Sequence, residues 1–227
     1  MKKLLCSFFL VKICFLCYNL TNLDVICMNY DKLMEDEINS IEKENPTLLL
    51  HACCAPCSSA CLERLGDIFK ISILYYNPNI TDKMEYDKRL DELHRFISKI
   101  DSKNKINIID GRYDTNEFDN IASGLENEPE RGRRCYKCYK LRMEETAKVA
   151  SEKNFDYFAT TLSLSPHKNV NWINEIGEDL DKIYDAKYLY SDFKKKNGYK
   201  RSIELSHKYN LYRQDYCGCI YSKKNRG

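Results

Sequence analysis

Short apolar runs alternate with longer amphipathic stretches along most of the chain. The apolar runs have the length of buried strands, and they cover residues 47–54, 69–80, 106–114 and 155–162. Between them apolar residues recur at helical spacing, and residues 85–100 carry Leu90, Leu93, Phe96, Ile97 and Ile100 on one face. Strands that alternate with helices indicate βαβ units. The pattern therefore predicts an α/β fold with a mostly parallel sheet and flanking helices.

Further helices are predicted around this alternation. They cover residues 30–44, 171–183 and 200–209, and also residues 116–153 on both sides of a break at 126–134. Another helix follows the first strand, where Ser58 or Ser59 is expected to cap it. The chain shows no internal repeat and no low-complexity linker. Residues 28–227 are therefore interpreted as a single α/β domain.

The first 27 residues differ from the rest of the chain. Their basic start and apolar run resemble a secretory signal, but Lys12 interrupts the run and no small-x-small cleavage site follows. The run is also too short and too broken for a membrane span. Because Met28 opens an ordinary polar N-terminus, residues 1–27 are interpreted as a disordered extension or a wrongly assigned start, with a signal or anchor, or a structured element, as the alternatives. Under the first interpretation the cysteines of this segment carry no chemistry: Cys6, Cys14, Cys17 and Cys27.

Charge is balanced over the 227 residues, because 36 Lys and Arg face 34 Asp and Glu, for a formal charge of +2. This balance neither requires nor excludes a nucleic-acid partner, so only local clusters can argue for one. Residues 130–142 and 193–201 are such clusters, rich in Lys and Arg with tyrosines between them. They predict either a solvated face or a track for phosphate groups.

Chemically active side chains follow each predicted strand. Cys53 and Cys54 follow the first strand, Asn77 the second, residues 110–114 the third and residues 163–168 the fourth. In parallel sheets, ligands bind beyond the carboxyl ends of the strands. The sequence therefore predicts one site at that edge of the sheet.

Cysteine is unusually frequent, with 12 in the chain. Seven of them gather in three motifs, Cys-Cys-x-x-Cys, Cys-x-x-Cys and Cys-x-Cys: Cys53, Cys54, Cys57, Cys135, Cys138, Cys217 and Cys219. Cys61 lies one helical turn beyond the first motif and is expected to be a buried helix thiol. The three motifs require an explanation in terms of chemistry, because a chain of this length buries a core without them.

Four kinds of site use such thiols. A disulfide framework is disfavoured, because adjacent cysteines pair with strain and an odd number cannot all pair. A redox dithiol uses one Cys-x-x-Cys and leaves the other thiols unexplained. Structural zinc needs four thiolates, normally from two close knuckles, and leaves three over. An iron–sulfur cluster takes four thiolates from scattered loops, and the other three can hold a second metal or face a substrate. The cluster is favoured, and zinc stays open.

Six segments between residues 45 and 223 form one ordered pattern: LLLHACCAPCSS, LYYNPNI, EYDKRL, GLENEPERGRRCYKCYKLRMEETA, FATTLSLSPHKN and LYRQDYCGCIYS. Together they resemble the cobalamin-independent epoxyqueuosine reductase family. The combination of the three thiol motifs is specific, although each motif alone is a weak signal.

The resemblance implies a fold like that of the adenine-nucleotide alpha-hydrolases (HUP). It implies the last step of queuosine biosynthesis, in which the epoxide of epoxyqueuosine, at the wobble position of a tRNA, is reduced to an alkene. It also implies a [4Fe–4S] cluster with an adjacent mononuclear iron, held by the seven grouped cysteines. The expected substrate is tRNA carrying epoxyqueuosine, the expected location is cytoplasmic, and no membrane is expected to take part.

This chemistry makes further demands on the chain. Net deoxygenation consumes two electrons and two protons, so a redox cofactor and an electron donor, which the sequence does not identify, are required. A hard oxygen ligand beside the thiolates is expected from Asp114, with Asp110 and Asp215 as alternatives. Asp114 is therefore predicted as a catalytic and metal-binding residue.

The spacing of the thiols suggests how they divide. Cys135 and Cys138 face alike across one helical turn and are expected to share one metal. The adjacent pair Cys53 and Cys54 is expected to point in two directions and to serve different metals.

The histidines and some tyrosines are weaker candidates. His167, in the loop after the fourth strand, is predicted to contact substrate or to donate a proton. His51 fits a hydrogen-bonded core position as well as it fits proton donation. His94 and His207 lie on predicted helices and are expected at the surface or in packing. Four tyrosines could stack on a base but fit packing equally well: Tyr75, Tyr76, Tyr113 and Tyr216.

Two other functions fit parts of the pattern. One is a zinc-stabilised nucleic-acid-binding module without catalysis, and the other is a different tRNA-modifying thiol or sulfur enzyme. The first strand is not followed by a Ser-Gly-Gly-x-Asp-Ser pyrophosphate loop, which argues against ATP-driven adenylation. The metal-dependent reductase is therefore the favoured function.

Overall fold

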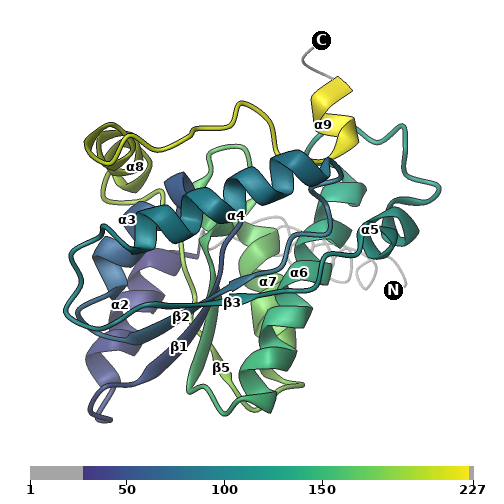
Figure 1. Ribbon diagram of the computed structural model, residues 1–227. Helices are drawn as coiled ribbons and strands as arrows, with labels where there is room; N and C mark the ends of the chain where they lie inside the picture. Colours follow the sequence, from purple (N-terminus) through teal and green to yellow (C-terminus); the bar gives the residue numbers. More distant parts are fainter. Residues whose placement is uncertain (1–27, 225–227) are drawn as a thin grey trace, which may run out of the picture.

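A computed structural model describes residues 28–224. Five parallel strands form one sheet in the order β3-β2-β1-β4-β5, with helices on both of its faces (Figure 1). The strands are β1 (Thr47–His51), β2 (Lys70–Tyr75), β3 (Asn107–Asp110), β4 (Tyr157–Thr160) and β5 (Lys187–Tyr188). This order is that of doubly wound nucleotide-binding folds. The predicted α/β class with a parallel sheet and flanking helices is confirmed, and the sheet fits a HUP-like fold.

The helices follow the predicted amphipathic stretches. They are α2 (Tyr30–Ser40), α3 (Ala55–Leu65), α4 (Lys83–Ile97), α5 (Thr115–Ala122), α6 (Arg133–Glu152), α7 (Val170–Asp181), α8 (Gly198–Lys208) and α9 (Ile220–Lys224), with a 3-10 turn η1 (Thr161–Leu164). The break predicted between the two helices of residues 116–153 is confirmed. Three short elements, β5, η1 and α9, were not predicted, because two to five residues carry no readable period.

The predicted cap of α3 is wrong. Cys54 is the N-cap residue, and Pro56 lies in the first turn, where proline's fixed φ suits a helix start. The helix therefore begins before Ser58 and Ser59. Their hydroxyls instead donate back to the carbonyls of Cys54 and Pro56, at 2.8 and 2.9 Å. The consequence is that the first thiol motif lies on the helix start itself.

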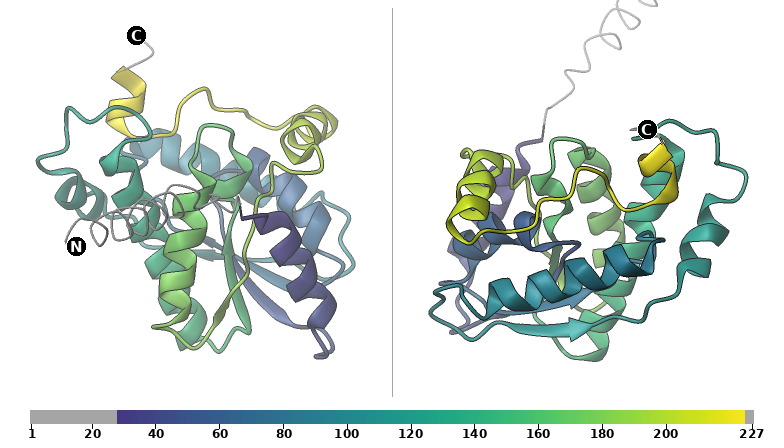
Figure 2. Two further views of the ribbon diagram at one scale, coloured as in Figure 1. Left: turned by 180° about the vertical axis from the view of Figure 1, so that it is seen from behind. Right: turned by 45° about the horizontal axis from the view of Figure 1, so that its top comes forward.

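Side chains of β1 alternate between two apolar layers. Leu48 and Leu50 pack with α2, α3, α4 and α8 on one face, and Leu49 packs with α6 and α7 on the other. Figure 2 shows the two layers from behind and from a view tilted by 45° so that the top comes forward. Helices cover both faces of the central strands β1 and β4, so a ligand can reach these strands only at their ends. The strands are parallel, and their carboxyl ends therefore lie together along one side of the sheet, called here its carboxyl edge. The segment between α8 and α9 crosses this edge (Figures 1 and 2).

Gly177 allows α7 to lie flat against the ring of Tyr188 in β5. A Cβ at this position would meet the Tyr188 Cζ atom at 2.2 Å. The ring is buried, and its hydroxyl donates to Asn174 Oδ1 at 3.1 Å, so it has little room to move. We expect Gly177→Ala to lower the free energy of unfolding by about 2–3 kcal/mol, measured by urea unfolding of the metal-free chain. Gly124→Ala, where a Cβ meets nothing within 4 Å but φ is +74°, serves as the comparison. An equal or smaller loss for Gly177→Ala would contradict the prediction.

Within residues 28–224, no helix combines the length and apolar character that a bilayer crossing requires. The predicted extension at residues 1–27, with its four cysteines, lies outside the described residues.

Candidate metal centre

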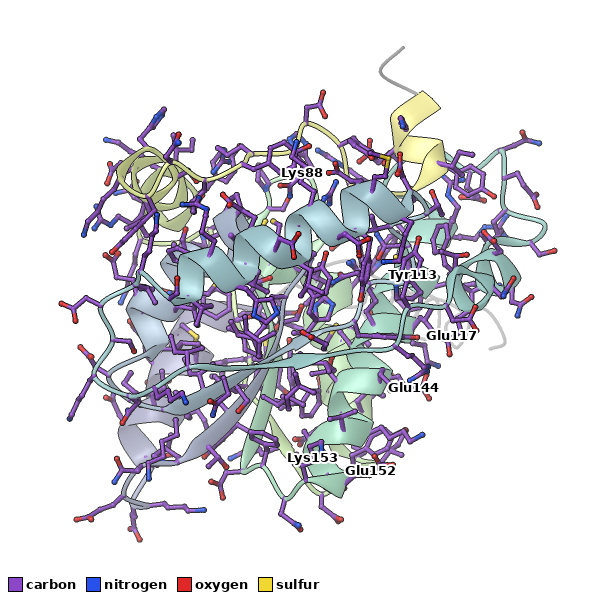
Figure 3. All side chains as sticks on the ribbon, viewed as in Figure 1. Lys88, Tyr113, Glu117, Glu144, Glu152 and Lys153 are labelled. Carbon is purple, nitrogen blue, oxygen red and sulfur yellow. The ribbon has the colours of Figure 1, made fainter. Side chains whose placement is uncertain are left out.

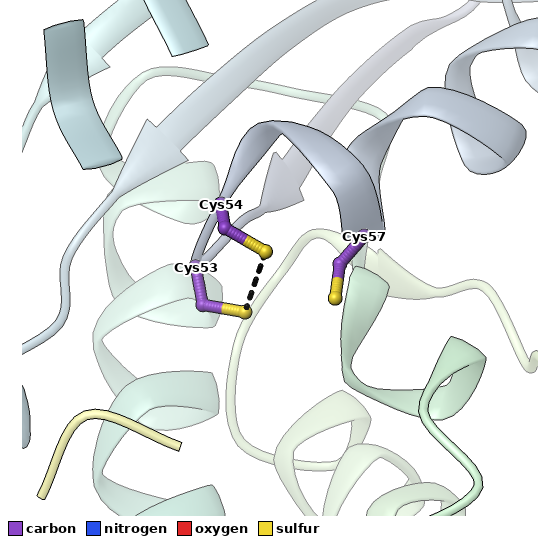
Figure 4. Close-up of side chains that lie close together, drawn as sticks. All are labelled: Cys53, Cys54 and Cys57. Atoms are coloured by element: carbon purple, nitrogen blue, oxygen red, sulfur yellow. Dashed lines mark hydrogen bonds between the residues drawn. The ribbon is translucent and has the colours of Figure 1, made fainter. Parts of the chain in front are cut away.

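The first thiol motif forms a compact triangle at the start of α3 (Figure 4). The sulfur atoms of Cys53, Cys54 and Cys57 all lie within 4.8 Å of one another, and Cys53 Sγ lies 3.9 Å from Cys54 Sγ. Cys54 has extended backbone (φ −174°, ψ 160°), after which the chain turns into α3. This turn brings both sulfurs to the same side, so the expectation that Cys53 and Cys54 point in two directions is wrong. The three thiols can bind one metal ion together.

The second motif lies at the start of α6, where Cys135 and Cys138 are one helical turn apart. The backbone N–H of Arg131 donates to Cys135 Sγ at 3.3 Å. Arg131 has φ +72°, an uncommon conformation for a residue with a side chain. Backbone strain at this point therefore accompanies the orientation of a thiol.

The third motif lies between α8 and α9, where Gly218 separates Cys217 from Cys219. Gly218 has φ +111°, and a Cβ there would approach Ile80 Cγ1 to 2.9 Å. Glycine is therefore required for both the conformation and the close approach. Arg89 secures this turn, because its guanidinium donates to the carbonyls of Tyr216 and Cys217 at 3.3 and 3.1 Å.

All three motifs face one cavity of about 290 Å³ at the carboxyl edge of the sheet. Six thiols line it: Cys53, Cys57, Cys135, Cys138, Cys217 and Cys219. The seventh, Cys54, accepts a hydrogen bond at 2.8 Å from the amide nitrogen of Gln214, which also lines the cavity. Among the described residues, only the first motif places three potential ligand atoms within 4.8 Å. The other four thiols line the same cavity.

The thiols of the first motif hold their protons unequally. Hydrogen bonds from Cys54 and Cys57 lower the pKa of Cys53 well below its usual range, although burial opposes this change. The same contact with Cys53 raises the pKa of Cys54 to about 12, and it raises the pKa of Cys57 as well. Of the three thiols, Cys53 is therefore the most acidic in the metal-free triangle. A metal ion would replace the shared protons.

Two cations accompany the thiols. Lys168, in the loop after β4, is half-buried and lines the cavity. Burial alone would lower the pKa of its ammonium group, but the charges of Cys217, Cys53 and Cys57 outweigh burial and raise it. Arg142 is buried on α6, one turn beyond Cys138. The sequence analysis included Lys168 only within residues 163–168 and Arg142 only within the basic run 130–142, and it singled out neither as a site residue.

The chemistry of the wall fits a sulfur-rich, anionic metal group. Eight buried side-chain atoms of the described residues have no hydrogen-bond partner, and five of them belong to Asn79, Arg142 and Gln214. Asn79 and Gln214 line the cavity. Soft thiolate ligands select iron–sulfur clusters or zinc over hard cations. Three of these five atoms are donors, namely Asn79 Nδ2 and the Nε and Nη2 of Arg142, and unused donors suit the sulfur atoms of such a centre.

Comparison with known proteins gives the family of this chain. The family model described as "Epoxyqueuosine reductase QueH" matches residues 48–225. The chain belongs to this family. The resemblance inferred from the motifs is therefore confirmed over nearly the same residues.

Individual members of the QueH family are similar to this chain over most of its length. Epoxyqueuosine reductase QueH of Streptococcus pyogenes serotype M1 is 45% identical over 204 residues, which cover 88% of this chain and 80% of that protein. The QueH of Staphylococcus epidermidis is 43% identical over 206 residues, covering 88% and 87%. The QueH of Thermotoga maritima is 32% identical over 186 residues, covering 79% and 92%.

Cys61 of this QueH family member is a buried helix thiol, as predicted. It is fully buried in α3, and its thiol donates to the carbonyl of Cys57 at 3.3 Å. Desolvation raises the pKa of Cys61 well above its usual range, which keeps it neutral.

His51 occupies a core position. Its Nε2 faces the carbonyl oxygen of Tyr76 at 3.1 Å, and because a carbonyl only accepts, Nε2 carries the proton. Its Nδ1 then accepts from the hydroxyl of Thr160 at 3.0 Å. Burial lowers the pKa of His51 to about 3. Of the two interpretations left open for His51, the hydrogen-bonded core position applies. His94 and His207 are exposed on α4 and α8, as expected.

The structure separates the predicted catalytic residues. His167 lines the cavity rim, and its Nδ1 accepts from Arg131 Nη2 at 2.9 Å. Asp114 caps α5, accepting from the N–H of Asn116 at 3.0 Å, and it does not belong to the cavity lining. Figure 3 shows its neighbours Tyr113 and Glu117 beside the same helix start. Asp110 lies 3.3 Å from His94 Nε2 and is also absent from the cavity lining. Of the three aspartates, only Asp215 lines the cavity.

The tyrosines divide in the same way. Tyr75 and Tyr76 are fully buried, and the Tyr75 hydroxyl donates to the carbonyl of Tyr86 at 3.0 Å. The Tyr113 hydroxyl donates to the carbonyl of Ile80 at 3.1 Å. Tyr216 alone of the predicted four lines the cavity, together with two tyrosines that the sequence did not single out, Tyr139 and Tyr199.

The basic run at residues 130–142 serves two purposes. Arg134 and Arg142 are buried, and Arg134 donates to the carbonyls of Leu125, Glu126 and Glu128. Four members are exposed: Arg131, Arg133, Lys137 and Lys140. Only the exposed part of the run is available for phosphate groups.

Proposed function

We propose that this chain reduces the epoxide of epoxyqueuosine in tRNA to the alkene and releases the oxygen as water, completing queuosine. The convergence of three thiol motifs on one cavity, in a member of the epoxyqueuosine reductase family, is the observation that carries the proposal. An external electron donor supplies two electrons for each turnover. A cytoplasmic location, where tRNA is modified, is part of the proposal.

The proposed cofactor is a [4Fe–4S] cluster with an adjacent mononuclear iron, held by the seven grouped cysteines. When bound, this centre supplies electrons one at a time and a Lewis acid for the epoxide oxygen. Asp215, which lines the cavity, replaces Asp114 as the proposed oxygen ligand. The N-cap role of Asp114 makes a structural contribution to α5 instead.

The remaining side chains handle the base and the protons. A wobble base extruded from the anticodon loop would enter between the rings of Tyr199 and Tyr216, which line the cavity. Lys168 supplies a positive charge at the reacting oxygen, and His167 relays protons from solvent at the rim. Exposed cations of residues 130–142 and 193–201 would hold the phosphates.

The full chain, purified without oxygen, tests this proposal. We expect iron together with about four acid-labile sulfides per chain and little zinc. With a low-potential reductant, the protein should convert epoxyqueuosine in tRNA to queuosine. Zinc without iron, combined with tRNA binding but no queuosine, would support the zinc-stabilised binding module instead. Iron and sulfide without queuosine would point to another thiol enzyme acting on tRNA.

A further inference from the structure

Arg142 is a buried cation without an acidic partner. Its side chain is 1% exposed, and its Nη1 donates to Asn77 Oδ1 at 3.2 Å. Its Nε and Nη2 have no hydrogen-bond partner. The ion pairs found within residues 28–224 do not include it. An unpaired buried charge is among the most unfavourable arrangements in a protein interior.

Arg89 shows how the same fold satisfies a buried arginine. Its side chain is also 1% exposed, but its Nε donates to Glu85 at 2.7 Å. Its two terminal nitrogens donate to the carbonyls of Tyr216 and Cys217. The contrast indicates that the anion for Arg142 comes from outside the polypeptide.

The position of Arg142 identifies where that anion would lie. On α6, Cys135, Cys138 and Arg142 follow one another at i, i+3 and i+7, which places them on one helix face. Asn77, which accepts from Arg142, donates to the carbonyl of Ala52 at 2.8 Å, directly before Cys53. The guanidinium is thus tied to two thiol motifs. Burial acts to lower the pKa of Arg142, and the nearby groups of Cys138, Cys217 and Cys53 outweigh burial and raise it.

We propose that Arg142 is the buried counter-ion of the thiolate-ligated metal centre, a positioning residue whose charge offsets the negative charge of the centre and favours its reduced form. The inference rests on the proposed function in taking an iron–sulfur centre as the anion. A cluster with four thiolate ligands carries a net negative charge, and reduction adds one more negative charge. A buried cation nearby stabilises this added charge.

The test compares Arg142→Met with Arg142→Lys and with the matched control Arg89→Met. All are made in the full chain and studied metal-free and metal-loaded. Metal-free Arg142→Met is expected to unfold at the same temperature as the metal-free wild type or at a higher one, because the substitution removes an unpaired buried charge that destabilises the fold. The loaded variant should lose iron to a chelator about tenfold faster and show a more negative midpoint potential, with Arg142→Lys between the two. Arg89→Met should unfold at lower temperature in both forms.

Two results would overturn the inference. One is a fall in the unfolding temperature of metal-free Arg142→Met as large as that of Arg89→Met, which would indicate an ordinary structural role. The other is wild-type iron retention and midpoint potential in loaded Arg142→Met. Failure of the proposed function looks different, because the wild type itself would then bind no iron or produce no queuosine. If zinc occupies the thiolates, the same comparison of unfolding temperatures and of zinc retention still applies, since that centre is also anionic.

Discussion

Replacing Cys138 by serine is expected to abolish the visible absorption of the proposed iron–sulfur centre and, with it, the reductase activity. Cys138 is buried at the cavity wall on the same helix face as Cys135. A serine oxygen is a harder ligand on a shorter bond, and soft thiolates are what select such centres. We expect activity to fall by at least about 100-fold, measured with epoxyqueuosine-containing tRNA. Cys135→Ser should behave in the same way.

Cys61→Ser is the matched control for these variants. It makes the same chemical change at a buried cysteine of α3 that does not belong to the lining of the thiol cavity. A serine hydroxyl can donate to the carbonyl of Cys57, as the thiol does at 3.3 Å, so the helix should tolerate it. The control should keep wild-type iron, sulfide and absorption. Full absorption in Cys138→Ser would remove this residue from the ligand set.

The fold could be predicted wherever the spacing of apolar residues followed a strand or helix pattern over enough residues. Four strands and seven helices were readable, because each buries one face or one stripe for several residues. β5, with two residues, is held by its pairing to β4, a contact between distant parts of the chain that no local pattern contains. The helix start at Cys54 was misassigned because serine at the following positions offered a common cap, whereas Pro56 set the true start.

The thiols of the candidate site could be predicted, but the surroundings could not. The three cysteine motifs can be read directly from the sequence, and their combination is specific although each motif alone is a weak signal. Arg142 sits in a basic run that resembles a solvated face, and only the packing of α6 against the sheet buries it. Asp114 was chosen for its place after β3, yet that edge of the sheet contributes a helix cap rather than cavity wall. Whether a side chain is buried, and whether it faces the cavity, depends on how the elements pack in the assembled fold.

Replacing Lys168 by methionine should lower kcat by about 10²–10³-fold and leave the iron content unchanged. When the C–O bond of the epoxide breaks, negative charge develops on the oxygen, and a cation held in a partly water-excluded cavity stabilises that charge. Lys168 lines the cavity, and the thiols of Cys217, Cys53 and Cys57 keep its pKa raised, so its ammonium group stays charged at neutral pH.

His167→Ala tests whether His167, rather than Lys168, makes the larger contribution to kcat. His167 is exposed at the rim, and Arg131 already occupies its Nδ1, so only Nε2 can serve the reaction and solvent can replace it. We therefore expect a smaller fall in kcat than for Lys168→Met at saturating tRNA. Lys153→Met, at the exposed opposite end of α6 (Figure 3), is the charge-matched control and should keep wild-type kcat. A large fall for His167→Ala with little change for Lys168→Met would reverse the assignment. Equal iron content across the variants would ensure that the difference reflects catalysis and not loss of the metal centre.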